Sequence, residues 1–217
     1  MSDVVYINTE NSAYQYLQNS HGDPHNHLGP EEWVQKQIDW ANQSEPSGLG
    51  LIEPISKLNG DLIGVEIGVC LGSTTEALLQ QIPNIKKMYA VDNYPSFIDW
   101  NGGNISEERQ SLMKAYAFKR LSPFADKVDF CYQSSVDFAK RFPDKEYFDF
   151  VFIDGDHSED ASYLDFCNFY PLVKKGGIFA GHDIVLPDVE KSLKRFFGET
   201  FSKIIRVSNN AWYLIKE

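Results

Sequence analysis

Apolar residues follow two different spacings along this chain, and the change comes at about residue 61. Before it, apolar side chains recur at helical spacing over Glu31–Gln43 and over Leu51–Leu58, on either side of a break rich in Ser, Pro and Gly. After it, short apolar runs alternate with amphipathic segments, which is typical of strands alternating with helices. The pattern predicts a helical N-terminal extension over residues 1–60 and an α/β domain over residues 61–217.

The α/β domain is predicted to be a Rossmann-like, seven-stranded, mostly parallel sheet with helices on both faces. Only Ser208, Asn209 and Asn210 separate the last two strands, so this hairpin makes the final strand antiparallel to its neighbour. The strands are expected at residues 62–67, 87–92, 127–132, 148–153, 177–182, 202–207 and 211–216. The helices are expected at residues 74–82, 106–120, 135–142, 158–173 and 187–197.

Composition and charge exclude several classes of protein. The formal net charge of −11 disfavours a nucleic-acid partner, because an acidic surface repels phosphates. Residues 1–12 do not resemble a secretory signal, and no run approaches the about 20 apolar residues that a membrane span needs. Cys70, Cys131 and Cys167 are far apart and odd in number, which does not fit a disulfide framework. A cytoplasmic location and no membrane partner are therefore expected.

The segment Val65–Thr75 is interpreted as a buried strand that turns through two glycines into a helix. Gly68 and Gly72 leave bare backbone where a ligand can approach, and the helix N-terminus offers free N–H groups. The carboxylate of Glu66 suits an amino group or hydroxyls better than a phosphate. The third glycine of a dinucleotide fingerprint is missing, and so is the lysine of a phosphate loop. A tight structural turn in any α/β protein is the alternative interpretation.

Further polar residues follow the other predicted strands. In open α/β sheets, ligands bind beyond the carboxyl ends of the strands. Asp92 follows the second strand, where it is placed either to accept hydrogen bonds from a ribose or to act as a turn acid. Ser134 is placed either to meet an adenine edge or to cap the next helix.

A group of acids and histidines follows two neighbouring strands. Asp154 ends an apolar strand, and His157, three residues later, can accept a proton near neutral pH. His182 and Asp183 end the next strand. Asp154 and Asp183 would lie close enough to share a divalent cation, and two carboxylates suit magnesium or manganese. His182 as a third ligand would favour manganese, iron or zinc over magnesium.

Over about residues 61–217, these motifs resemble those of the class I S-adenosylmethionine-dependent methyltransferases. Glu66, Gly68 and Gly72 are similar to the first motif of that class, which holds the methionine moiety, and Asp92 matches the acid that binds the ribose hydroxyls. The cofactor implied by the resemblance is S-adenosylmethionine. The residues implied to bind it are Glu66, Gly68, Gly72, Ser73, Thr74, Asp92, Ser134 and Asp154.

Within the class, residues 152–157 and 176–184 resemble the branch that contains macrolide-sugar O-methyltransferases, cephalosporin-tailoring proteins and, more distantly, catechol O-methyltransferases. In that branch, the acid matching Asp154 binds magnesium, and the histidine matching His157 is the general base of the sugar-modifying members. The residue matching His182 is usually an acid, so this chain departs from the pattern at a position that bears on metal identity.

The resemblance implies an O-methyltransferase that acts on a hydroxyl of a small polar acceptor, a sugar or sugar-bearing metabolite. His157 and Asp154 are the expected catalytic residues. Asp154, His182 and Asp183 are the expected ligands of a magnesium or manganese ion. Residues 1–60 are expected to cover the acceptor or to build a homo-oligomer.

Three alternatives remain open at this point. The first is a metal-independent methyltransferase with His157 or Asp156 as the base. The second is a protein that binds the cofactor without turnover, and the third is a nicotinamide oxidoreductase, which the missing third glycine disfavours. His21, His25 and His27 lie in a stretch rich in Gly and Pro, where they either bind a metal or line the acceptor pocket, or belong to a solvated loop.

Overall fold

The computed structural model describes residues 27–98, 104–142 and 146–217. The strands of the main sheet are β1 (Leu62–Ile67), β2 (Ile85–Val91), β5 (Val128–Cys131), β6 (Phe148–Ile153), β7 (Val173–Gly181), β8 (Ile205–Arg206) and β9 (Trp212–Ile215). The described α-helices are α2 (Pro30–Gln43), α3 (Ile52–Ser56), α4 (Ser73–Gln81), α5 (Glu107–Leu121), α6 (Ser135–Ala139), α7 (Glu159–Phe169) and α8 (Pro187–Phe197). Two short strands, β3 (Phe97–Ile98) and β4 (Asn104–Ile105), pair separately.

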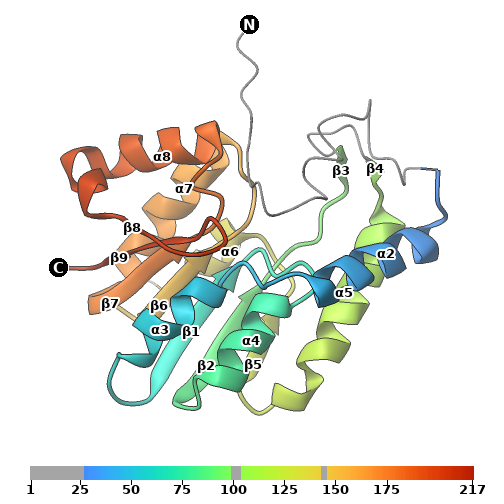
Figure 1. The fold of residues 1–217 in the computed structure, drawn as a ribbon, viewed down its shortest axis with the longest axis horizontal. Helices are drawn as coiled ribbons and strands as arrows, with labels where there is room; N and C mark the ends of the chain where they lie inside the picture. Colours follow the sequence, from blue (N-terminus) through green and yellow to red (C-terminus); the bar gives the residue numbers. More distant parts are fainter. Residues whose placement is uncertain (1–26, 99–103, 143–145) are drawn as a thin grey trace, which may run out of the picture.

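The main sheet has the order β5-β2-β1-β6-β7-β9-β8, with helices on both faces (Figure 1). The central strand β1 pairs in parallel with β2 and with β6, and β9 pairs antiparallel with both β7 and β8. Asn209 and Asn210 both have positive φ angles, 57° and 59°, as a tight hairpin between twisted strands requires. The predicted fold class, including the antiparallel last strand, is confirmed.

The alternation of side chains along the central strands explains why both faces are covered. Val151 and Ile153 of β6 belong to a core shared with α6, α7 and α8. Phe150 and Phe152 of the same strand belong to a second core, which includes residues of α3 and α4. Since successive side chains of a strand point to opposite faces, an almost entirely apolar strand must be buried on both sides.

Several predicted boundaries are wrong. The strand expected over residues 202–207 contains only β8, because a 3-10 helix occupies Gly198–Lys203. The helix expected over residues 158–173 ends at Phe169, because Pro171 has no backbone N–H to continue it. The helix expected over residues 135–142 ends at Ala139. At Pro171 the apolar spacing continues although the helix ends, so spacing alone does not locate this boundary.

The described part of the N-terminal extension packs against the α/β domain. Trp33 and Val34 of α2 are buried in a core with Met113 and Ala117 of α5. The guanidinium of Arg109 lies 4.7 Å from the ring centroid of Trp33, a cation–π contact. Helix α2 is therefore anchored by apolar packing and by an arginine. In the described ranges, every helix is too short or too polar to cross a membrane.

Candidate functional site

The predicted site residues lie at or just beyond the carboxyl ends of β1, β2, β5, β6 and β7, at one edge of the sheet. From β1 the chain continues to β2 and then β5 on one side, whereas β6 and β7 lie on the other. The gap between the ends of β1 and β6 is thus the switch point of the sheet, where open α/β folds bind ligands.

The two glycines after β1 are required by the backbone itself. Gly68 has a φ of +86°, and a Cβ added there would lie 2.1 Å from the backbone oxygen of Asp154. Gly72 has a φ of +78° and precedes α4, where an added Cβ would lie 3.3 Å from the Leu121 side chain. Both positions favour glycine because of their positive φ angles. Position 68 also favours glycine because the backbone just after β6 approaches it closely. The turn therefore lies directly beside Asp154.

Asp92 holds this turn in place. Its Oδ2 accepts hydrogen bonds from the backbone N–H groups of Val69 at 2.9 Å and Cys70 at 3.0 Å. Its Oδ1 accepts from the N–H of Tyr94 at 2.7 Å. Asp92 thus acts as a turn acid in this structure. An ionised carboxylate has about four acceptor positions, so three bonds leave capacity for a ligand hydroxyl.

Glu66 is buried, with 1% of its surface exposed, and accepts a hydrogen bond from the Thr75 hydroxyl. Burial raises the pKa of Glu66 to about 8, although the Thr75 hydrogen bond opposes the shift. The carboxyl is therefore largely protonated at neutral pH. The Glu66 carboxyl therefore contacts α4 inside the protein and does not face the open edge of the sheet.

The hydroxyls predicted to bind the cofactor also have partners within the protein. Ser73 accepts a hydrogen bond from Arg120, and Thr74 accepts one from the backbone N–H of Gly48 at 3.3 Å. Ser134 caps α6, because its Oγ accepts from the N–H of Asp137 at 3.1 Å. Cofactor binding by these side chains remains a prediction.

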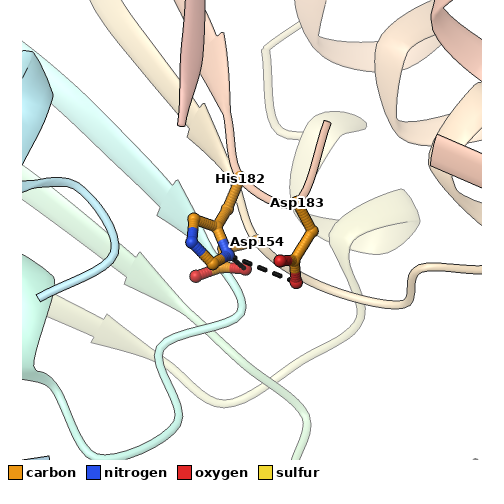
Figure 2. Close-up of side chains that lie close together, drawn as sticks. All are labelled: Asp154, His182 and Asp183. Carbon is orange, nitrogen blue, oxygen red and sulfur yellow. Dashed lines mark ion pairs between the residues drawn. The ribbon is translucent and has the colours of Figure 1, made fainter. Parts of the chain in front are cut away.

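Asp154, His157, His182 and Asp183 converge at the ends of β6 and β7. His182 Nδ1 lies 3.4 Å from Asp154 Oδ1 and 3.2 Å from Asp183 Oδ2. Figure 2 shows His182 and the two carboxylates facing one another across this short gap. His157 Nε2 approaches the same two oxygens, at 3.5 Å and 3.2 Å. The structure therefore brings the predicted base and the predicted metal ligands into one cluster.

Two features fix the geometry of this cluster. His182 Nε2 lies 2.6 Å from the backbone oxygen of Asn209. A carbonyl only accepts, so Nε2 carries the hydrogen and Nδ1 faces the carboxylates. Asp183 is buried and has a φ of +53°, a conformation that non-glycine residues adopt at a cost. Such strain is concentrated at functional sites.

The charges of the cluster balance one another. Burial alone would raise the pKa of Asp154, but His182 and His157 outweigh it and hold that pKa below its usual range. Burial alone would lower the pKa of His182, but Asp154 and Asp183 raise it well above its ordinary value. The pKa of His157 is raised against burial by the same two carboxylates. Two carboxylates facing two imidazoles can hold either protons or a cation between them.

Sequence reasoning missed the roles of Asn209 and of Asp165. Asn209 was expected only as a hairpin residue, and its contact with His182 bridges 27 residues of sequence. Asp165 is buried on α7 and accepts a hydrogen bond from Ser135 at 2.6 Å. Burial raises the pKa of Asp165 to about 6. An acid among the apolar residues of a helix, as in Leu164–Phe169, is the signal that could have indicated a buried carboxyl.

The remaining histidine predictions have separate outcomes. His27 is exposed, whereas His21 and His25 lie outside the described residues. Asp156, the alternative base, accepts a hydrogen bond from the N–H of Ser158 at 2.8 Å, close to the start of α7.

Comparison with known proteins identifies the family. A sequence model of the family described as "Methyltransferase domain" matches residues 65–184, which is more than half of the chain. No curated protein matches the sequence.

Solved structures share the fold at low identity. One is the O-methyltransferase from Bacillus cereus in complex with SAH, with 16% identity, 96% of this chain and 99% of that chain covered, and a TM-score of 0.58. A protein from Corynebacterium glutamicum has 15% identity, with 94% of this chain and 97% of that chain covered, and a TM-score of 0.59. The O-methyltransferase NovP has 15% identity, with 83% of this chain and 79% of that chain covered, and a TM-score of 0.52. The chain therefore belongs to the methyltransferase domain family, and it has the fold of the S-adenosylmethionine-dependent class I enzymes.

Proposed function

We propose that this protein transfers a methyl group from S-adenosylmethionine to a hydroxyl of a small polar acceptor, a sugar or a sugar-bearing metabolite. The observation that carries the proposal is the cluster of Asp154, His157, His182 and Asp183 beside the Gly68 turn. A proton acceptor and a place for a cation thus lie next to the expected position of the methyl donor.

The turn after β1 fits the cofactor. Gly72 provides no side-chain cap to α4, so the first N–H groups of this helix have no capping side chain and remain suited to a polar or anionic end of a ligand. Asp92 keeps acceptor capacity for ribose hydroxyls. Glu66, Ser73 and Thr74 would act by holding the turn, because their oxygens already have protein partners.

The donor set near Asp154 fits a divalent ion. Carboxylate oxygens of Asp154 and Asp183 and the Nδ1 atom of His182 all lie within 4.8 Å of one another. The cofactor supplies the methyl group, and a divalent ion held by these three residues would lower the pKa of the acceptor hydroxyl.

His157 is the proposed general base. Its Nε2 faces Asp154 and Asp183, so the neutral ring carries its hydrogen there and accepts the hydroxyl proton at Nδ1. Its side chain is 40% exposed, which leaves room for an acceptor to approach. The new O–C bond forms as the S–C bond breaks, and the proton of the hydroxyl passes to His157. General base assistance of this kind contributes about 10²–10⁴ in rate.

A metal-independent reaction at the same site is the second candidate. It is supported by the contacts of both histidines with the carboxylates, which hold the cluster together without a cation. In this case His157 is again the base, and His182 orients the acids. Activity that survives a chelator would favour this candidate over the metal-assisted reaction.

We further propose that residues 1–60 cover the acceptor or contribute to a homo-oligomer. The support is the position of α2, whose Trp33 shares a core with Val69 and Leu71 of the glycine turn. A change in this segment is therefore expected to alter the affinity for the cofactor. Size-exclusion chromatography with light scattering tests the oligomer, and a Trp33→Ala variant with a weaker affinity for S-adenosylhomocysteine would support the contact with the turn.

The proposed function is tested with the purified full-length protein. Calorimetry with S-adenosylmethionine and S-adenosylhomocysteine comes first, followed by methyl-labelled cofactor with sugars, catechol, amines and thiols. We expect binding of both cofactor forms and label transfer to a sugar hydroxyl. Absence of binding would refute the cofactor assignment, and transfer only to amines or thiols would refute the acceptor class.

A further inference from the structure

We propose that the turn at Asn209 makes His182 a nitrogen ligand, so that the metal centre selects a first-row transition ion over magnesium. In this assignment, the ligands are Asp154, Asp183 and His182, and His157 stays outside the set. The inference rests on the proposed function, because it names the class of ion and the division of roles at the same site.

The two histidines approach the same carboxylates but differ in their surroundings. His182 has 14% of its side chain exposed, against 40% for His157. The Nε2 atom of His182 donates to the Asn209 carbonyl at 2.6 Å, so Nδ1 is the atom directed toward Asp154 and Asp183, where an ion would replace the proton that Nδ1 shares with them. Metal-bound histidines usually donate their other N–H to a carbonyl or carboxylate in this way. For His157, no hydrogen-bond partner at Nδ1 is found among the described residues.

Asn209 is itself held firmly. Its side-chain amide donates to the backbone oxygens of Glu45 at 3.1 Å and Pro46 at 3.2 Å. Its φ of +57° belongs to the hairpin between β8 and β9. The carbonyl that orients His182 is therefore anchored to a segment about 160 residues earlier in the chain. Asn209 is a positioning residue, since it acts on the ion through His182.

The donor set decides which ion is preferred. Magnesium prefers six oxygen ligands and loses its water reluctantly, whereas an imidazole nitrogen suits the later first-row ions. Three protein ligands with open positions are also typical of catalytic centres. Affinity within such a set is expected to rise from manganese through iron and cobalt. Replacing the imidazole with a carboxylate should restore the preference for magnesium.

The test is a metal titration of the chelator-treated full-length protein, without cofactor or acceptor. Free Mn²⁺ is measured by electron paramagnetic resonance, and bound Co²⁺ by its visible spectrum. We expect one Mn²⁺ site from which an excess of Mg²⁺ of about 100-fold does not displace the ion. The spectrum of bound Co²⁺ should indicate nitrogen ligation. In His182→Asp, Mg²⁺ should compete, and in His157→Ala, Mn²⁺ affinity should stay within about threefold.

Matched substitutions in the turn test the role of Asn209. Asn209→Gly keeps a residue that accepts a positive φ but removes the contacts with Glu45 and Pro46, and it should weaken Mn²⁺ binding about 10-fold. Asn210→Gly changes the neighbouring turn residue, whose φ is also positive, and should leave the affinity within about twofold. Circular dichroism and unfolding midpoints verify that each variant folds.

Three outcomes would overturn the inference. They are displacement of Mn²⁺ by an equal concentration of Mg²⁺, no metal site at all, and loss of the site in His157→Ala with its retention in His182→Ala. Equal effects of the two turn substitutions would overturn the role of Asn209. None of these outcomes decides the proposed methyl transfer, which is judged separately from cofactor binding and from label transfer measured both with added metal and with a chelator.

Discussion

The hydroxyl of Thr75, in the first turn of α4, donates a hydrogen bond to the buried carboxyl of Glu66, at the end of β1. This contact joins the two elements that flank the glycine turn. The carboxyl that makes it has a pKa of about 8 because it is buried, with smaller contributions from the charges of Asp154 and Asp92. The proton on Glu66 is thus part of the folded state at neutral pH.

The protonation of Glu66 predicts a pH-dependent stability. Its pKa in the folded protein lies above the unfolded value of 4.5, so the folded state binds the extra proton between about 4.5 and about 8. As the pH rises through this window, the free energy of unfolding should therefore fall by up to about 1.4 kcal/mol per pH unit. Glu66→Gln should flatten the slope in urea denaturation from about pH 5 to about pH 9, whereas the exposed Glu31→Gln should not.

Gly68→Ala should destabilise the fold more than a positive φ alone explains. The added Cβ would lie 2.1 Å from the backbone oxygen of Asp154, whereas Gly60, with a φ of +83°, has open space around it. We expect a loss of about 1–2 kcal/mol for Gly60→Ala and at least about 3 kcal/mol for Gly68→Ala. Denaturant unfolding measures both. Equal losses would show that the approach of β6 to the turn does not constrain this position.

Asp92→Ala should weaken cofactor binding before it affects the chemical step. The change removes the acceptor expected for the ribose hydroxyls and also the hydrogen bonds to Val69 and Cys70. We expect S-adenosylhomocysteine to bind about 10- to 100-fold more weakly, since a hydrogen bond to a charged group contributes about 1.5–3 kcal/mol. Calorimetry with the exposed Asp126→Ala as a control checks this. An unchanged affinity would leave Asp92 as a turn residue only.

His157→Ala should reduce turnover while leaving the cofactor affinity nearly intact. Loss of a general base predicts a fall in kcat of about 10²–10⁴, with binding of S-adenosylhomocysteine within about threefold of the original protein. Single-turnover methylation and calorimetry separate the two effects. A large loss of cofactor binding in this variant would contradict the assignment of His157 as the base.

The strands and helices with strong periodicity could be predicted from the sequence. Strands β1 and β6 and helix α8 have the expected bounds. Strands β1 and β6 are buried almost throughout, and α8 is buried along one face, so the apolar spacing of each follows its burial directly. A helix or strand can end at a proline or at a contact with the sheet even though the apolar spacing continues. Pro171, just after α7, is an example.

The candidate site could be predicted in part. Alternation with helices predicts parallel strands, and parallel strands end at the same edge of the sheet, which places Asp154 and Asp183 at that edge. The partners of individual side chains could not be predicted. Ser73 meets Arg120 and Thr74 meets Gly48, across 47 and 26 residues, so neither hydroxyl is directed by its neighbours in the sequence.

The sequence by itself determined the fold class, the glycine turn and the residue types at the strand ends, because spacing and composition record local geometry directly. Only the tertiary structure decided that Gly68 lies against Asp154, that Glu66 is buried and protonated, and that Asn209 orients His182. Those relationships depend on which strands become neighbours and on how closely their ends approach, and that information is distributed over the whole chain rather than contained in any one segment.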